Sequence, residues 1–294
     1  MSRAVRKHLG IQPGDLENKP YAKYWNPLMA PLPEHAREAL AQGPIAPPML
    51  PAFADAAMVF ETSSAALENG FALSPEGALH VAIRTEMPEC LPGMVDWWFG
   101  WHSEEPQRYK LWHPRAHVHA EWRPNSVAAA TRGASEVLNP SGNETVQASA
   151  IRDRYVGRTS CVDEYVGSTL GSYFIRFLNP AELGLDLARL ADPRIGTAIC
   201  ARIGFANLPF DFGYLAHYVT RTPGGSVMQS RFWIGGDYAR PRRGGLAADL
   251  ALRVTKRIMR PSARDGAELL VHCSQEMSHL ASFLPKLHAE LGDT

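Results

Sequence analysis

The chain has 294 residues, of which 45% are hydrophobic and 20% charged, and its 30 Lys and Arg residues balance 30 Asp and Glu residues. A neutral chain lacks the basic excess that nucleic acids and anionic membranes select for, so we expect neither as a partner. No stretch approaches 18 consecutive apolar residues, and the first residues carry charges and proline where a signal peptide is apolar. We therefore expect a cytoplasmic protein that acts on a small molecule.

The four cysteines lie tens of residues apart. This spacing excludes a Cys-x-x-Cys metal site and a dense disulfide framework, and it favours reduced thiols packed in the core. The motifs GxGxxG, Walker A, GxSxG and HExxH are all absent from the sequence. Dinucleotide-binding, phosphate-loop, serine-hydrolase and zincin interpretations therefore lose their usual support.

Residues 1–58 are rich in proline, which excludes a long helix or a central strand there. We expect an irregular arm with one short helix near Glu34–Ala41, serving as a lid or a dimerisation region. The remaining residues, 59–294, are expected to form the catalytic domain of a homodimer.

Hydrophobic periodicity predicts the elements of that domain in chain order. They are a strand at Leu79–Arg84, a helix at Met94–Trp101, two extended pieces within Tyr109–Trp122, strands at Val162–Val166 and Tyr173–Phe177, a hairpin of Tyr214–Arg221 with Ser226–Ile234, and a helix at Ala263–Leu291 that Pro285 bends or interrupts. This order predicts an α+β fold in which an antiparallel sheet grips one long helix, with a cavity between them.

His272 and Glu276 lie four residues apart on the predicted last helix, on a face that is otherwise apolar. A carboxylate that faces a core is costly unless something cationic satisfies it. A divalent metal bound by imidazole nitrogen and carboxylate oxygen is one interpretation. A buried hydrogen bond between the two side chains is the other.

A second cluster contains His113, His117 and His119. On an extended strand His117, His119 and Glu121 share one face, and alternate histidines are a suitable half of a zinc site. A polar face in contact with solvent explains the same pattern without a metal.

Three further features are candidate site residues. Glu164 lies between Val162 and Val166 on one predicted strand face, where a buried residue is expected. His217, in the hairpin, is either a general base or a core histidine. Trp97 and Trp101 form either a core stripe or the aromatic wall of a pocket.

Four segments together resemble the 2,4-diacetylphloroglucinol hydrolases and the related phloretin hydrolases. They are WWFGWH (97–102), RYKLWHPRAHV (108–118), HYVTRTPGGSVMQSRFWIGG (217–236) and HCSQEMSHLASFLP (272–285). The resemblance covers roughly residues 60–290. It implies a Bet v 1-like (START-like) helix-grip fold with an added amino-terminal dimerisation region. It also implies a zinc-dependent hydrolase that cleaves the carbon–carbon bond between an acyl group and a phloroglucinol-type ring of a phenolic ketone.

The resemblance also implies a set of site residues. The metal ligands are His117, Glu164, His272 and Glu276. His117 follows Tyr109 by eight residues, as the family's ligand follows a pocket tyrosine, and His113 and His119 are open alternatives to it. Glu121 is the alternative to Glu164, because a variable insertion at Pro124–Asn143 blurs that match. Tyr109 and His217 match positions that contact the substrate, and with Glu164 they form the expected catalytic group. Trp97 and Trp101 are expected to stack on the substrate ring.

Two alternatives remain. The first is a non-catalytic carrier of an aromatic or polyketide ligand on the same fold, which needs no metal. The second keeps the metal but hydrolyses esters or processes polyketides as a lyase.

Overall fold

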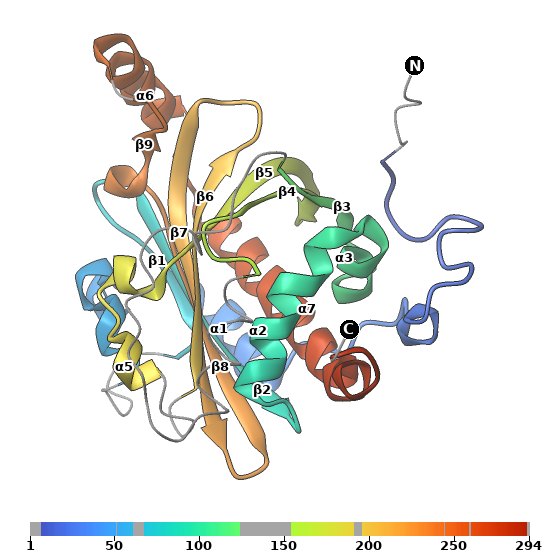
Figure 1. Ribbon diagram of the computed structural model, residues 1–294. Coiled ribbons are helices and arrows are strands. Elements are labelled where there is room, and N and C mark those ends of the chain that lie inside the picture. Colours follow the sequence, from blue (N-terminus) through green and yellow to red (C-terminus); the bar gives the residue numbers. More distant parts are fainter. Residues whose placement is uncertain are drawn as a thin grey trace, which may run out of the picture.

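The protein is described by a computed structural model that covers residues 7–50, 52–60, 68–123, 154–190, 196–243, 245–258 and 260–292 (Figure 1). The insertion expected at Pro124–Asn143 lies outside these residues.

A strongly curved antiparallel sheet forms the body of the molecule (Figure 1). In the described residues it has nine strands in the order β1-β2-β8-β7-β6-β5-β4-β3, with the short β9 beside β7. The strands are β1 (Gly70–Leu73), β2 (Ala78–Pro88), β3 (His117–Trp122), β4 (Thr159–Val166), β5 (Thr169–Leu178), β6 (Thr197–Phe205), β7 (Phe210–Thr222), β8 (Gly225–Gly235) and β9 (Arg240–Pro241). The predicted strands and the hairpin of β7 with β8 are confirmed.

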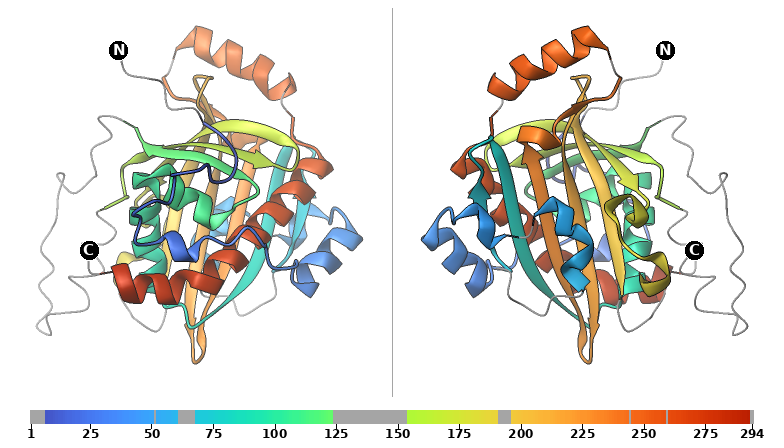
Figure 2. Two further views of the ribbon diagram at one scale, coloured as in Figure 1. Left: turned by 90° about the vertical axis from the view of Figure 1, so that its right-hand side faces the viewer. Right: turned by 90° about the vertical axis from the view of Figure 1, so that its left-hand side faces the viewer.

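The sheet wraps around the long helix α7 (Ala263–Leu291), which crosses its concave face (Figure 2). Ser262 caps the helix, because its hydroxyl accepts the Asp265 N–H while the Asp265 carboxylate accepts the Ser262 N–H. Apolar side chains of α7, such as Leu270, Met277 and Leu280, are fully buried against the sheet. The expected helix-grip fold is therefore confirmed.

Helix α7 continues through Pro285, so the expected interruption at that residue is wrong. Proline lacks the N–H that would bond to the carbonyl of Ala281. The buried thiol of Cys90 contacts that carbonyl instead, at 3.8 Å. The carbonyl freed by proline thus keeps a donor, and the helix tolerates the residue.

Two helices cover the end of the sheet beside α7, namely α2 (Pro92–Trp101) and α3 (Pro106–Trp112) (Figure 1). The tryptophan stripe lies on α2 as expected. The prediction of an extended segment that begins at Tyr109 is wrong, because Tyr109–Trp112 belongs to α3. Pro106 occupies the first turn of that helix, where its missing N–H costs nothing, and Pro114 follows the helix end.

The amino-terminal arm contains α1 (Glu34–Gln42), which confirms the predicted short helix. The arm is tied to the domain by polar contacts, since Lys19 and Tyr21 both contact Glu105 and Lys23 pairs with Glu290. A 3₁₀ segment at Phe53–Phe60 and the short α5 (Leu187–Leu190) lie near the convex face of the sheet.

Helix α6 (Leu246–Ile258), which no sequence pattern led us to expect, extends at one end of the sheet (Figure 2). Across the described ranges, no helix has the length and apolar character needed to span a bilayer.

Candidate metal centre

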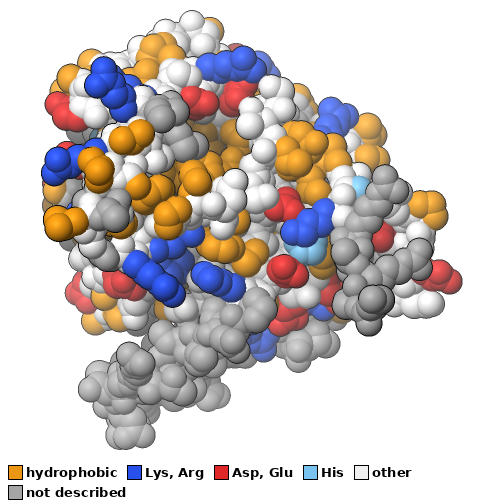
Figure 3. Space-filling view, turned by 90° about the horizontal axis from the view of Figure 1, so that it is seen from above, with side chains coloured by type: hydrophobic (Ala, Val, Ile, Leu, Met, Phe, Trp, Pro, Cys, Tyr) orange, Lys and Arg blue, Asp and Glu red, His pale blue; other side chains and the backbone are white. Residues whose placement is uncertain are grey.

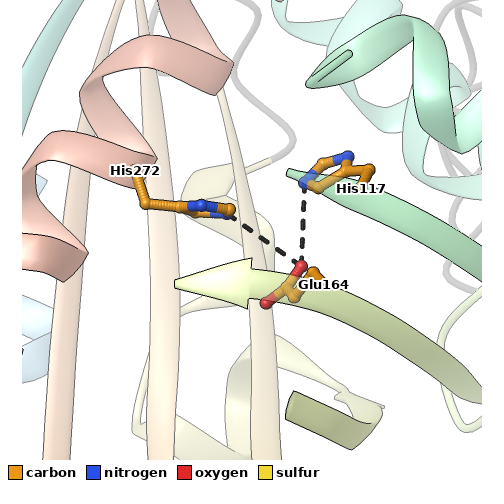
Figure 4. Close-up of side chains that lie close together, drawn as sticks. All are labelled: His117, Glu164 and His272. Atoms are coloured by element: carbon orange, nitrogen blue, oxygen red, sulfur yellow. Dashed lines mark ion pairs between the residues drawn. The ribbon is translucent and has the colours of Figure 1, made fainter. Parts of the chain in front are cut away.

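Four side chains from three elements converge at one point inside the grip. His117 begins β3, Glu164 lies on β4, and His272 and Glu276 lie on successive turns of α7. His117 Nε2 is 3.4 Å from Glu276 Oε2 and 3.6 Å from Glu164 Oε2. His272 Nε2 is 3.6 Å and 4.0 Å from the same two oxygens. Figure 4 shows His117, Glu164 and His272 pointing toward one another, and their ligand atoms all lie within 4.8 Å.

Tyr109 orients two members of this group. Its backbone carbonyl accepts a hydrogen bond from His117 Nδ1 at 2.9 Å, and its ring stacks on the imidazole with 3.7 Å between centroids. Its hydroxyl donates to Glu164. The carbonyl fixes the His117 tautomer so that Nε2 faces the other ligands, as for histidines that bind metals.

The remaining two members are held from α7 and from β4. The ring of His272 hydrogen-bonds to the backbone of Tyr165. The thiol of Cys273 donates to Glu276 and also contacts Ser230. Each of the four side chains therefore has a contact that directs its ligand atom inward.

The electrostatics of the group favour a cation. Burial lowers the pKa of His272 to about 4 and the pKa of His117 well below its usual range, so both imidazoles are neutral. Burial raises the pKa of Glu164 to about 7, and burial together with Glu164 raises that of Glu276 well above its usual range. In the described part of the chain, no Lys or Arg pairs with either carboxylate. A divalent metal would satisfy both acids and the buried Nε2 of His117, which has no hydrogen-bond partner.

The structure separates His117 from His119. A β-bulge shifts the register of β3, so that His117 pairs with Glu164 whereas His119 pairs with Asp163 on the opposite face. His119 Nε2 contacts Glu121 at 3.4 Å, and 57% of the Glu121 side chain is exposed. The expectation that His117, His119 and Glu121 share one face is therefore wrong, because the bulge inserts one extra residue between the two histidines.

His113 is a neighbour of the group rather than a member of it. Its ring lies nearly parallel to that of His272, with centroids 5.0 Å apart, and its side chain contacts Gln275. Among the described residues, the compact cluster of possible ligands contains His117, Glu164 and His272. The geometry thus favours His117 over His113 and His119.

The group opens into a cavity of about 570 Å³ between α7 and the sheet. Its walls are mostly apolar and aromatic, and Tyr109, Glu164, His217, His272 and Glu276 all line it. Figure 3, seen from above, shows apolar side chains gathered in a hollow on this face, with charged side chains around it. An apolar cavity with a few convergent polar groups is the usual form of a small-molecule site.

His217 lies on β7 at the inner end of this cavity. Its Nδ1 contacts the Ser230 hydroxyl at 2.8 Å, and burial lowers its pKa to about 3. The imidazole is therefore neutral and held in place by its neighbour on β8.

The tryptophans occupy different positions from those expected. Trp97 stacks on Trp101 with centroids 5.0 Å apart, and both are buried in the core beside α7 and the arm. Neither belongs to the described residues that line the cavity, whereas Phe99 and Trp112 do. The aromatic wall thus exists, but Trp97 and Trp101 lie behind it.

Three polar residues at the inner end escaped the sequence reasoning. His102 contacts the Ser103 hydroxyl, which contacts that of Ser160, and both His102 and Ser160 line the cavity. His102 ends the segment WWFGWH, so it carried a signal. The two serines, one in the 3₁₀ segment His102–Glu104 and one on β4, carried none, because serine is usually a surface residue.

Comparisons with known proteins identify the family of this chain. Residues 49–289 match the profile of the DAPG hydrolase PhiG domain. The chain is 32% identical over 281 residues to a 2,4-diacetylphloroglucinol hydrolase of Pseudomonas sp, covering 94% of this chain and 90% of that protein. It is also 29% identical over 280 residues to the phloretin hydrolase of Eubacterium ramulus, covering 93% and 91% respectively.

Among solved structures, Ara h 8.0201 aligns with 66% of this chain and 99% of its own, at 11% identity and a TM-score of 0.30. The assignment of the fold rests on the chain's own elements. With its profile match and its identity to the Pseudomonas enzyme, this chain belongs to the DAPG hydrolase PhiG domain family, and it is an enzyme of the hydrolase class.

Proposed function

We propose that this protein is a zinc-dependent hydrolase that cleaves the carbon–carbon bond between an acyl group and a phloroglucinol-type ring. The observation that carries the proposal is the convergence of two histidines and two glutamates at the wall of an apolar cavity. The substrate class comes from the relatives, which are named as a 2,4-diacetylphloroglucinol hydrolase and a phloretin hydrolase.

The separations between the histidines and the glutamates fit zinc, and His117, Glu164 and His272 form the compact part of the group with Glu276 beside them. Tetrahedral zinc with bonds of about 2.0–2.2 Å places its ligand atoms about 3.4 Å apart. The four measured separations between imidazole nitrogens and carboxylate oxygens lie between 3.4 and 4.0 Å. His117, Glu164, His272 and Glu276 would hold the ion, which when bound supplies Lewis-acid polarisation of the acyl carbonyl.

The reaction needs a leaving group that can accept electrons. An aryl anion leaves poorly, but a phloroglucinol ring can shift a hydroxyl proton to the carbon that bears the acyl group and become a ring ketone. Water then adds to the acyl carbonyl, the carbon–carbon bond breaks, and its electron pair enters the ring as an enolate. A proton returns to the ring oxygen, which gives a carboxylic acid and a phenol.

The protein's own residues provide the positioning and the proton transfers. His217 lines the cavity and is held by the Ser230 hydroxyl, where its imidazole can hydrogen-bond a ring hydroxyl and transfer the proton; general acid–base groups contribute about 10²–10⁴-fold in rate. Tyr109 holds Glu164 through its hydroxyl and contributes one wall of the cavity. The buried, largely apolar surroundings keep bulk water away from the ring enolate.

Metal analysis and product analysis together test the proposal. Plasma mass spectrometry of protein purified without chelator should find stoichiometric zinc, and chelation should remove it together with activity. Liquid chromatography should then detect an acid and a phenol from phloretin or diacetylphloroglucinol. A protein that takes up no zinc and binds these phenols unchanged would be a carrier, and one that prefers simple aryl esters would be an esterase.

Three further expectations stay predictions. They are the division between residues 1–58 and 59–294, the homodimer, and the cytoplasmic location. No described residue of the arm lines the cavity, so we assign the arm to dimerisation rather than to a lid. Light scattering on the purified protein tests the dimer.

A further inference from the structure

The cavity extends well beyond the metal centre along one face of α7. Asp265, Leu269, His272 and Glu276 all line it, and they recur at the spacing of a single helix face. With a helical rise of ~1.5 Å per residue, the stretch from Glu276 to Asp265 measures about 16 Å. Along α7 the cavity therefore extends from the metal centre toward the amino-terminal end of the helix, which we call its outer side, and the wall that carries His102, Ser160 and His217 is its inner side.

The inner side is polar. His102 and Ser160 line it, and they are linked through the Ser103 hydroxyl. His217 adds a third group that can form hydrogen bonds. A ring that carries several hydroxyl groups finds partners here and would leave them unpaired elsewhere in the cavity.

The outer side, beneath α6, is apolar. The tilted rings of Phe205 and Phe212 lie there with centroids 4.4 Å apart, and Phe210 packs against Leu252 of α6. All four line the cavity. Tyr173, whose ring lies 5.8 Å from that of Phe205 and 6.0 Å from that of Phe212, adds one hydroxyl to this largely apolar wall.

The charged side chains at the rim already have partners. Lys256 pairs with Asp237, Arg260 donates to the Pro75 carbonyl, and Glu268 pairs with Arg264. The Asp265 carboxylate accepts a hydrogen bond from the Ser262 hydroxyl. An occupant of the outer side therefore meets apolar surface rather than a charge seeking a counter-ion.

We infer that the outer side is an acyl-chain channel and that the preferred substrates carry a long alkyl or arylalkyl acyl group rather than acetyl. The inference rests on the proposed function, because the metal centre places the acyl carbonyl between the two sides. With the hydroxylated ring on the inner side, the acyl substituent points along α7 toward Phe205, Phe212 and Leu252. Burial of one methylene is worth ~0.8 kcal/mol, which corresponds to about fourfold in affinity.

A homologous series of acylphloroglucinols tests the channel. The holoenzyme is assayed with acetyl, butanoyl, hexanoyl and 3-phenylpropanoyl phloroglucinol, which differ only in the acyl group. We expect kcat/KM to rise at least tenfold from acetyl to hexanoyl, and the 3-phenylpropanoyl compound to match or exceed hexanoyl. Equal values across the series, or a preference for acetyl, would overturn the inference.

Two substitutions on α6 locate the effect. Leu252→Trp fills the outer side and should lower kcat/KM for the hexanoyl compound at least tenfold while changing that for acetyl less than threefold. Leu250→Trp is the matched control, because Leu250 is 64% exposed on the same helix and lies outside the cavity lining. It should leave both substrates unchanged.

Phe212→Ala gives a second route if the tryptophan variant fails to fold. It removes one aromatic wall and should reduce the ratio of kcat/KM for the hexanoyl compound to that for the acetyl compound. Equal losses for both substrates in either variant would overturn the channel and make the outer side an entrance only. Complete inactivity of the wild-type holoenzyme toward the whole series would instead contradict the proposed function, so the two failures are distinguishable.

Discussion

Replacing Glu164 with Gln should stabilise the metal-free protein at alkaline pH. Burial raises the pKa of this carboxyl from 4.5 to about 7, and only 16% of its side chain is exposed. Because the folded protein binds this proton more tightly than the unfolded chain, the associated stability is full below about pH 4.5 and is lost as the pH rises through about 7. At ~1.4 kcal/mol per pKa unit, ionisation costs the folded state about 3 kcal/mol at pH 8.

Glutamine occupies the same volume and never ionises, so Glu164→Gln should recover that energy. Urea unfolding in the presence of chelator, followed by tryptophan fluorescence, measures the difference. We expect the free energy of unfolding of the Gln variant to exceed that of the wild type by about 3 kcal/mol at pH 8 and by less than about 1 kcal/mol at pH 5. At an unfolding entropy of ~2.1 cal/mol/K per residue, the pH 8 difference corresponds to about 5 °C in Tm.

Zinc should make the wild type more stable than the Glu164→Gln variant, the reverse of the order in the metal-free proteins. Binding to the folded state stabilises the wild type by about 4 kcal/mol when the free ion exceeds its Kd by a thousandfold, and the Gln variant loses a ligand. The matched control is Glu121→Gln, an exposed residue on the outer face of β3 that should change neither condition. Two results would refute the raised pKa of Glu164. One is a metal-free wild type that is as stable at pH 8 as at pH 5. The other is a Gln variant that is no more stable than the Glu121→Gln control.

Three other predictions concern the same site. His272→Ala and Glu276→Ala should each lower the amount of bound zinc at least tenfold and abolish turnover, while the circular dichroism spectrum stays unchanged. The control His119→Ala should retain both metal and activity. Normal turnover in either ligand variant would remove that residue from the site. Tyr109→Phe deletes the hydroxyl that contacts Glu164, and kcat should fall about 10–100-fold with zinc retained, so full activity would argue against its role. His217→Gln should lower kcat by about 10²–10⁴-fold at constant metal content, and a change confined to KM would leave it a binding residue only.

The long elements could be predicted because their patterns repeat many times. The 29-residue helix α7 has the predicted bounds, and the hairpin of β7 and β8 lies where the turn residues indicated. The same regularity exposed the site, since Glu276 and Glu164 interrupt apolar stripes that otherwise indicate burial. An acid at a position that the pattern assigns to the core was the most informative signal in the sequence.

Short elements were less predictable, because few residues give ambiguous periodicity. Alternation over Tyr109–Trp112 suggested a strand, yet Pro106 at the first turn and packing beside α7 make it helical. Helix α6 escaped notice for another reason. Its exposed residues include Leu246, Leu250 and Val254 as well as Arg253 and Arg257, so apolar and charged side chains both face solvent and the helix does not show the usual arrangement of a polar outer face and an apolar inner face.

The upstream histidine shows where periodicity ends and tertiary contact takes over. Strict alternation places His117 and His119 on one face, and no local rule announces the bulge that separates them. The spacing from Tyr109 to His117 does carry physical content, because the turn between α3 and β3 lets the Tyr109 carbonyl fix the His117 ring while the Tyr109 hydroxyl holds Glu164. One tyrosine thus orients ligands from two strands. A one-residue insertion in that turn would disturb both contacts at once, which gives a physical reason why this spacing predicts His117 as the ligand where the strand pattern alone does not.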